Sequence, residues 1–183
     1  MKLMRVGQPG NERPAVAVDE NNYIDISDLV PDFDADFFQN EKWFDIKAEV
    51  ANRIAAKDFR QVAGNRIGAP FVRPHQILCI GLNYADHAKE SGAEVPPEPI
   101  IFTKAPNTLI GPDDDVIIPK DSLKSDWEVE LGIVIGKRAK YLSSPADAEA
   151  HIAGYVLVND VSEREFQLER QGQWSKGKSC ETF

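Results

Sequence analysis

The stretch Ser125–Gly136, SDWEVELGIVIG, alternates apolar and other side chains as a β-strand does. Its large apolar residues occupy positions 127, 129, 131, 133 and 135, a period of two. Glu128 and Glu130 fall on the other, wet face, side by side and roughly 7 Å apart along the backbone. Because two like charges this close repel each other, a cation between them would relieve the repulsion. The stretch therefore predicts a strand that carries a paired-carboxylate site.

Composition limits the class of protein to which this chain can belong. The 183 residues are 42% hydrophobic and 28% charged, which is typical of a globular protein. The formal net charge of −9 argues against a nucleic-acid partner. Cys79 and Cys180 are the only cysteines, which suits reduced thiols in a cytoplasmic protein. The N-terminal residues lack the apolar segment of a signal peptide, and no run approaches the about 18 apolar residues of a membrane span, so we expect no membrane association.

The chain is expected to contain two domains. Residues 1–70 hold short strand-like runs and then, at 41–57, apolar residues at helical spacing, which predicts a small α+β N-terminal domain. Pro70 and Pro74 favour an extended linker at the boundary, so the second domain would span 71–183. The runs that predict strands are 2–7, 14–19 and 23–30 in the first domain, and 76–84, 115–120, 127–136 and 152–160 in the second. The Pro-rich segment 96–114 is also strand-like, with tight turns. Helices are expected at 85–91, from the Ser-Pro pair 144–145 onward, and at 161–171.

A third carboxylate follows the apolar run that ends in YVLVND. If that run pairs with the strand at 127–136, Asp160 would join Glu128 and Glu130 at one end of a sheet. Three oxygen ligands without Cys or His suit Mg²⁺ or Mn²⁺, with Ca²⁺ as a further option. The alternative is an ordinary solvated strand face followed by a turn aspartate, and the pattern alone leaves both readings open.

The segment NYADHAKE supplies a candidate general base. His87 and Glu90 are three residues apart, so on a helix they lie on one face and can form a hydrogen bond. A carboxylate that holds an imidazole fixes its tautomer and raises its basicity, which suits the activation of water. Such a pair also arises by chance on surface helices, and the position after a strand ending in Gly81 favours the functional reading.

Residues 172–179, GQWSKGKS, match the phosphate-binding pattern G-x-x-x-x-G-K-[ST]. That loop must leave an apolar strand and open a helix, whereas here a charged, helix-like segment precedes it. We therefore reject a nucleotide site. Lys178 remains of interest as a cation beside the carboxylates, where it could hold an enolate or a substrate carboxylate.

Taken together, several segments resemble the fumarylacetoacetate hydrolase family. The matching segments are CIGLNYADHAKE, PIIFTKAPNTLIGPDDDVIIP, DWEVELGIVIGK, IAGYVLVNDVSERE and QWSKGKSCETF. They cover nearly everything from 76 to 183, and MKLMRVGQPGNERPAV is similar to the small leader domain of the family's diketo-acid and sugar-acid branch. The resemblance implies an α+β, mainly β fold, in which a mixed β-roll forms the catalytic domain. It also implies a homodimer, and a catalytic domain that continues beyond GKSCETF, so that its C-terminal part would be absent here.

The resemblance assigns roles to individual residues. The implied metal ligands, for Mg²⁺ or Mn²⁺, are Glu128, Glu130 and Asp160. The implied catalytic residues are His87, Glu90 and Lys178, and the implied substrate-binding residues are Phe102, Lys104, Arg164 and Gln167.

By the same resemblance, the expected activity is hydrolysis of a carbon–carbon bond in a small 2,4-dioxo acid, an acylpyruvate or a diketo-deoxy sugar acid, through a metal-chelated enolate. The alternatives are an isomerase, tautomerase or decarboxylase acting on 2-oxo or 2-hydroxydienoic diacids, of the hydroxyheptadienedioate isomerase or oxaloacetate type. An inactive, truncated binding module is a further alternative.

Overall fold

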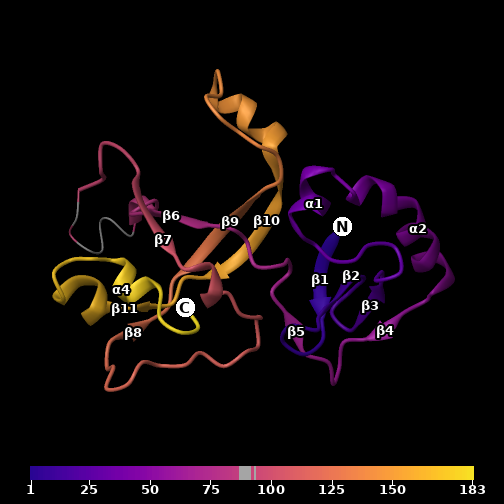
Figure 1. Ribbon diagram of the computed structural model, residues 1–183, viewed down its shortest axis with the longest axis horizontal. Helices are drawn as coiled ribbons and strands as arrows, with labels where there is room; N and C mark the ends of the chain where they lie inside the picture. The colour runs from indigo at the N-terminus through magenta and orange to yellow at the C-terminus, as the bar shows by residue number, and fades with distance from the viewer. Residues whose placement is uncertain (87–91, 93) are drawn as a thin grey trace. The chain divides into compact units, whose positions relative to one another are not determined.

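The computed structural model spans residues 1–183 and describes residues 1–86, 92 and 94–183 (Figure 1). Two compact units are present. The first comprises Met1–Pro74, Ile110–Asp115 and Val129–Val158, and the second comprises His75–Leu109, Val116–Glu128 and Asn159–Phe183. Each unit is described separately below.

The first unit contains an antiparallel sheet of five strands in the order β4-β3-β2-β1-β5. Its strands are β1 (Lys2–Val6), β2 (Arg13–Ala17), β3 (Asn22–Asp25), β4 (Arg60–Gln61) and β5 (Ile67–Gly68). Figure 1 shows two helices beside this sheet, α1 (Ala35–Gln39) and α2 (Trp43–Ala56). The strand expected at 23–30 is shorter, but the other N-terminal strands and the helix expected at 41–57 are confirmed.

The helices of the first unit are fixed by a cap and by aromatic packing. Asp34 precedes α1, and its side chain accepts a hydrogen bond from the Phe37 backbone N at 2.8 Å, which satisfies a donor of the first turn. Phe33 and Phe37 meet edge to face with ring centroids 4.8 Å apart. Both rings are completely buried with Ile24 and Ile26, so the core of this unit lies between the helices and the sheet.

The strand β9 (Val129–Ile135) lies in the first unit, as does β10 (Ile152–Asn159) up to Val158. The two strands pair with each other, so the condition that we set for Asp160 to approach Glu128 is met. A 3₁₀ helix, η2 (Pro145–His151), begins at the expected Ser-Pro pair. One feature differs from our expectation: the apolar side of β9 is the more exposed one, with Val129 and Leu131 each more than 60% exposed. The described residues leave this side uncovered, whereas Gly132 on the opposite side lies close against Val156.

The second unit is built from short elements. They are β6 (Ile77–Gly81), β7 (Ile100–Lys104), the 3₁₀ turn η1 (Pro106–Thr108), β8 (Ser125–Asp126), β11 (Ser162–Glu163), the π-helical turn η3 (Glu165–Glu169) and α4 (Ser175–Lys178). β6 pairs with β7, and β8 pairs with β11, both in antiparallel fashion. Both pairings join segments that are distant in sequence.

One of our expectations for the second unit is wrong and another holds only in part. Residues 115–120 form no strand, because the backbone N of Ile117 donates to Thr182 Oγ1 at 2.8 Å instead of to a neighbouring strand. Residues 161–171 form β11 and then a π-helical turn, because the first of them pair with β8 instead of coiling. The helix expected at 85–91 lies largely outside the described residues. Among the described residues, no helix has both the length and the apolar character required to cross a bilayer.

Candidate active site

The candidate site lies on the antiparallel strand pair β8–β11 and on the residues that extend its backbone hydrogen bonds at both ends. Beyond the paired strands, the Asp160 backbone N donates to Glu128 O at 2.8 Å, and the Arg164 backbone N donates to Lys124 O at 2.9 Å. Since residues two apart in a strand point to the same side, Asp126 and Glu128 share a face with Asp160 and Arg164. The backbone pairing therefore gathers three carboxylates and a guanidinium on one surface.

Asp160 lies at the centre of this group and is held by two lysines. Lys104 Nζ donates to Asp160 Oδ1 at 2.6 Å and to Val161 O at 3.0 Å. Lys178 Nζ donates to Asp160 Oδ2 at 2.9 Å. The three charged residues are 4%, 7% and 2% exposed respectively, so the contacts are shielded from water. Each carboxylate oxygen of Asp160 thus has its own lysine.

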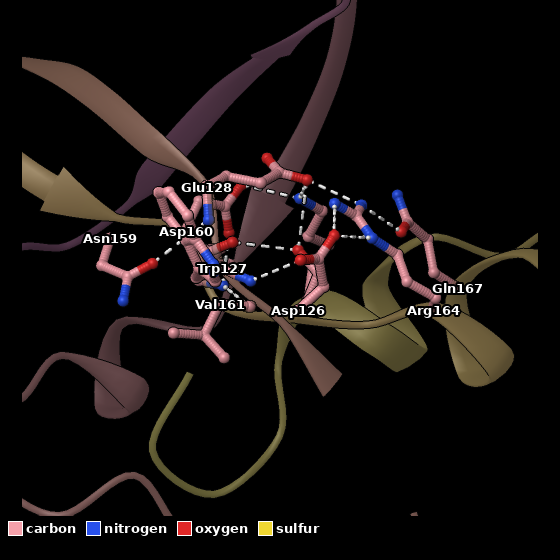
Figure 2. Close-up of polar contacts among 11 residues, drawn as sticks. Asp126, Trp127, Glu128, Asn159, Asp160, Val161, Arg164 and Gln167 are labelled. Carbon is pink, nitrogen blue, oxygen red and sulfur yellow. Dashed lines mark hydrogen bonds and ion pairs between the residues drawn. The ribbon is translucent and has the colours of Figure 1, made fainter. Parts of the chain in front are cut away.

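Lys178 and Arg164 both contact the second carboxylate, Glu128. Lys178 Nζ lies 3.0 Å from Glu128 Oε1, and Arg164 Nη1 lies 2.7 Å from the same oxygen. Figure 2 shows the Arg164 guanidinium directed toward Asp126 as well, and its Nη2 lies 2.7 Å from Asp126 Oδ2. Gln167 Oε1 accepts from Arg164 Nη1 at 3.0 Å, which fixes the outer side of the guanidinium. The cluster balances three cations against three carboxylates.

The contact between Arg164 and its exposed partner, Asp126, shifts the pKa of both groups. The hydrogen bond from Arg164 is the largest influence on Asp126 and lowers the pKa of that carboxyl group. Burial by itself would lower the pKa of Arg164, but the carboxylates of Asp126 and Glu128 outweigh it and raise this pKa. Both groups therefore stay charged at neutral pH, and Arg164 is a permanent cation of the site.

An aromatic ring lies near the ammonium group of each of the two lysines. Phe102 and Trp174 pack edge to face with centroids 5.4 Å apart, and Lys178 Nζ lies 5.2 Å from the centroid of the Phe102 ring. Lys104 Nζ lies 5.9 Å from the centroid of the buried Phe183 ring. The face of an aromatic ring attracts a nearby cation, so these rings help to hold the two ammonium groups in place.

A glycine in α4 allows Lys178 to reach the carboxylates. A Cβ atom at Gly177 would lie 2.2 Å from the backbone oxygen of Glu163 and 2.7 Å from the backbone N of Gln167. Only a residue without a side chain permits this approach of α4 to β11 and η3. α4 belongs to the phosphate-loop pattern noted above, and it follows the π-helical turn η3 instead of a strand, in agreement with our rejection of a nucleotide site.

One buried carboxylate was not foreseen. Glu163 has no exposed surface, and it accepts hydrogen bonds from Ser122 Oγ, from Ser125 Oγ at 2.9 Å and from the Glu165 backbone N at 3.2 Å. We read its segment as a polar helix, and no local pattern distinguishes this glutamate from its exposed neighbours. Asp126, the exposed partner of Arg164, was also missed, although it directly precedes the Trp-Glu-Val-Glu run.

The structure brings together most, but not all, of the residues selected from the sequence. Those that lie in the second unit are Phe102, Lys104, Glu128, Asp160, Arg164, Gln167 and Lys178. Glu130 lies in β9 of the first unit, and His87 and Glu90 lie outside the described residues. In the described part of the chain, no three Asp, Glu, His or Cys side chains form a group that could hold a metal ion. The three-carboxylate metal site therefore remains a prediction.

Two adjacent carboxylates of the cluster supply oxygen atoms of the type that bind divalent cations. Glu128 Oε1 and Asp160 Oδ2 share one positively charged group, the ammonium of Lys178, at 3.0 and 2.9 Å. Two carboxylate oxygens that already accommodate a cation between them are the ligand type that Mg²⁺ and Mn²⁺ prefer. Glu128 and Asp160 are therefore the residues that would hold such an ion.

The fold and the buried charged cluster define an α+β, mainly β protein with a sheltered, carboxylate-rich site. Residues 76–183 match the family described as fumarylacetoacetate (FAA) hydrolase, C-terminal. The chain belongs to the fumarylacetoacetate hydrolase family.

Relatives and solved structures agree with this assignment. The whole chain is 45% identical to a Burkholderia multivorans protein provisionally named a hydrolase, of which it covers 63%. It superimposes with a TM-score of 0.78, at 30% identity, on a fumarylacetoacetate hydrolase from Exiguobacterium antarcticum, covering 63% of that chain. It superimposes with a TM-score of 0.73, at 29% identity, on a probable 2-hydroxyhepta-2,4-diene-1,7-dioate isomerase from Mycobacterium abscessus, covering 61%. These likenesses confirm the expected fold class, and the chain spans less than two thirds of the length of each of these proteins.

Proposed function

We propose that this protein hydrolyses a carbon–carbon bond in a small 2,4-dioxo acid, such as an acylpyruvate, with the aid of Mg²⁺ or Mn²⁺. The family membership supports the reaction class. The observation that carries the proposal is the Glu128–Lys178–Asp160 bridge, in which a lysine 2% exposed contacts two carboxylates.

A bridge of this kind is better explained by function than by stability. Removing three or more charged groups from water costs several kcal/mol per ion, and apolar side chains of similar volume usually stabilise a fold at least as well. Buried charges with shared partners are concentrated at functional sites, where they orient ligands and reacting groups. In this protein the cluster contains carboxylates, which can bind a metal cation, and positively charged side chains, which can bind the anionic groups of a substrate. A site that binds a metal ion together with a keto acid requires both.

Three residues of the cluster have distinct roles in the proposed reaction. Arg164 remains positively charged and is exposed enough, at 24% of its side chain, to meet the carboxylate of an incoming substrate. Lys178 supplies a second positive charge beside Glu128 and Asp160, where negative charge on the 2-oxo group would develop. A bound divalent ion would add Lewis-acid stabilisation of that charge. Gln167 holds Arg164 in place.

His87 and Glu90 complete the proposal as the general base and its orienting carboxylate. His87 would accept a proton from water, and the resulting hydroxide would attack the carbonyl carbon farther from the substrate carboxylate. The carbon–carbon bond next to that carbonyl then breaks, its electron pair passing to the pyruvate fragment as an enolate, which is protonated. The products are a carboxylic acid and pyruvate, so one water molecule is consumed for each bond broken.

A second candidate is isomerisation of a 2-hydroxydienoic diacid. It is favoured by the structural similarity to the probable hydroxyheptadienedioate isomerase. Such a reaction would use the same cations to stabilise an enolate but would need no attack by water, so His87 would only move protons.

Product analysis distinguishes these candidates. The protein would be incubated with Mg²⁺ and one of three compounds at a time, an acylpyruvate, 2-hydroxyhepta-2,4-diene-1,7-dioate or oxaloacetate, and the products followed by ¹H NMR. Release of pyruvate and a carboxylic acid from the acylpyruvate, lost in the Lys178→Met variant, is the expected result. A shifted double bond in the diene without pyruvate release would favour the isomerase, and no turnover of any of the three compounds would contradict the proposal.

A further inference from the structure

We propose that Asp126 is a positioning residue, which holds one edge of the Arg164 guanidinium so that the opposite edge can receive the carboxylate of a keto acid. This inference rests on the proposed function, which brings such a carboxylate to Arg164. Neither the sequence patterns nor the family resemblance selected Asp126, so its role is argued from its contacts.

Asp126 contacts two nitrogen atoms of the guanidinium with a single oxygen. Its Oδ2 accepts a hydrogen bond from Arg164 Nε at 3.0 Å and another from Arg164 Nη2 at 2.7 Å (Figure 2). Its other oxygen, Oδ1, accepts from the backbone N of Trp127 at 2.9 Å, which fixes the orientation of the carboxylate. Asp126 therefore occupies the Nε–Nη2 edge of the arginine.

The opposite edge of the guanidinium adjoins the carboxylate cluster. A guanidinium is planar and carries five N–H donors in a fixed arrangement, so a partner on the Nε–Nη2 edge leaves the second hydrogen of Nη2 directed along the edge shared with Nη1. Nη1 lies 2.7 Å from Glu128 Oε1 and donates to Gln167 Oε1 at 3.0 Å. Of the described residues, only Asp126 accepts a hydrogen bond from Nη2. The Nη1–Nη2 edge is thus the one that offers a donor to an incoming carboxylate.

The strand pair explains why Asp126 can control this side chain. Asp126 lies opposite Ser162 in the β8–β11 register, and the Arg164 backbone N donates to Lys124 O at 2.9 Å. Asp126 and Arg164 are therefore diagonal neighbours on one face, a separation that a long side chain can span. Without this partner, the arginine would be free to turn both of its terminal nitrogens onto Glu128, since Nη1 already lies beside it. Holding the Nε side prevents this turn and spares the substrate the entropic cost of ordering the arginine.

The alternative role for Asp126 has the opposite sign. A carboxylate that competes with the substrate for Arg164 would weaken substrate binding, and its removal would tighten it. Competition requires Asp126 and the substrate to share an edge of the guanidinium, whereas Asp126 lies on the Nε–Nη2 edge. The geometry therefore favours positioning over competition.

A second ion pair with the same geometry supplies a matched control. Arg170 donates to Glu165 Oε1 from Nε at 3.0 Å and from Nη2 at 2.7 Å, in the same unit of the structure. Asp126→Asn and Glu165→Gln each remove one negative charge close to Arg164, but only Asp126→Asn releases its guanidinium. Both carboxylates are partly exposed, at 47% and 32% of the side chain, so both variants should fold, which circular dichroism verifies.

The probe is pyruvate, the keto acid that the proposed reaction releases. Its affinity for the 183-residue protein in the presence of Mg²⁺ is measured from saturation transfer to the pyruvate methyl signal in ¹H NMR. The half-saturating concentration should rise about tenfold in Asp126→Asn, which corresponds to one lost charge-assisted hydrogen bond, and should change less than about twofold in Glu165→Gln. Asp126→Glu, which keeps the carboxylate, should bind pyruvate more tightly than Asp126→Asn.

Two further readouts separate positioning from a purely structural effect. In ¹H–¹⁵N spectra, the Arg164 Nε–H signal, identified by its loss in Arg164→Met, should shift or broaden in Asp126→Asn and stay in place in Glu165→Gln. With an acylpyruvate as substrate, Asp126→Asn should raise KM about tenfold and change kcat by less than about threefold, because the weakened contact serves binding.

The outcomes distinguish the inference from the function on which it rests. Pyruvate binding that is equal or tighter in Asp126→Asn, or equally weakened in Glu165→Gln, would refute the positioning role and leave the proposed function standing, since acylpyruvate cleavage is measured separately. An unsubstituted protein that binds no pyruvate would refute anion binding by Arg164, and the role of Asp126 with it. Pyruvate binding with the expected effect of Asp126→Asn, but without cleavage of an acylpyruvate, would refute the proposed function and support the positioning role.

Discussion

Replacing Asp160 with asparagine tests whether the buried cluster is held together by this one carboxylate. The substitution keeps the size of the side chain and removes its charge, which leaves Lys104 and Lys178 with a neutral neighbour. Breaking a buried ion pair from one side costs about 3–5 kcal/mol of folding free energy. Lys104 retains Val161 O and Lys178 retains Glu128, so we expect the lower end of this range, about 3 kcal/mol.

Hydrogen exchange measures this loss within the second unit. At about 1.4 kcal/mol for each tenfold change, a loss of about 3 kcal/mol makes protected amides exchange roughly a hundredfold faster. Mass spectrometry of peptides that span β8 and β11 reports the rates. The matched control is Asp126→Asn, whose side chain is 47% exposed and whose pair with Arg164 should contribute at most about 1 kcal/mol. Equal protection in the two variants would refute the central position that we assign to Asp160.

Two further substitutions or modifications probe the surroundings of the cluster. Gly177→Ala should make the amide hydrogens of β11 exchange at least tenfold faster, because the new Cβ would lie 2.2 Å from the backbone oxygen of Glu163. The control Gly154→Ala, which has open space around it, should leave hydrogen exchange in β11 unchanged. Equal effects of the two substitutions would contradict this packing. Burial raises the pKa of the Cys79 thiol from 9.0 to about 11, so in a Cys180→Ser background iodoacetamide should label the folded protein at pH 8 about a hundredfold more slowly than the urea-unfolded chain. Equal labelling rates in the folded and unfolded protein would show that Cys79 is not sheltered. Since the folded state holds this thiol proton more tightly, the contribution of Cys79 to the free energy of unfolding is complete below pH 9 and declines as the pH rises toward 11.

Local patterns in the sequence predicted those elements that depend on local interactions. The spacing of apolar residues located α2, and the alternation along 127–136 located β9. The Ser-Pro pair at 144–145 located η2, where Ser144 and Asp147 form a reciprocal cap. These features require only neighbours along the chain, which explains why they can be read from it.

Features that depend on distant partners were misread or missed. Residues 115–120 have strand composition, but their backbone finds a hydrogen-bond partner in Thr182, 65 positions away from Ile117. Glu163 is buried because Ser122 and Ser125 reach it across the β8–β11 pair, which no local pattern indicates.

For the site, the sequence and the family resemblance selected residues, and the structure supplied their contacts. Lys104 and Asp160 are separated by 56 positions, yet their side chains lie 2.6 Å apart. Their pairing follows from the way β7 and the chain after β10 meet in the second unit, which periodicity cannot reveal. The substrate-binding role that we expected for Lys104 stays a prediction, and its contacts indicate that it also orients Asp160.

The most direct test of the metal proposal is an anomalous difference map, recorded at the manganese absorption edge, from crystals of the protein soaked in Mn²⁺. We expect a peak beside the carboxylates of Glu128 and Asp160, and no such peak in crystals of the Glu128→Gln variant. A map of the unsubstituted protein at saturating Mn²⁺ without a peak beside either carboxylate would contradict the account.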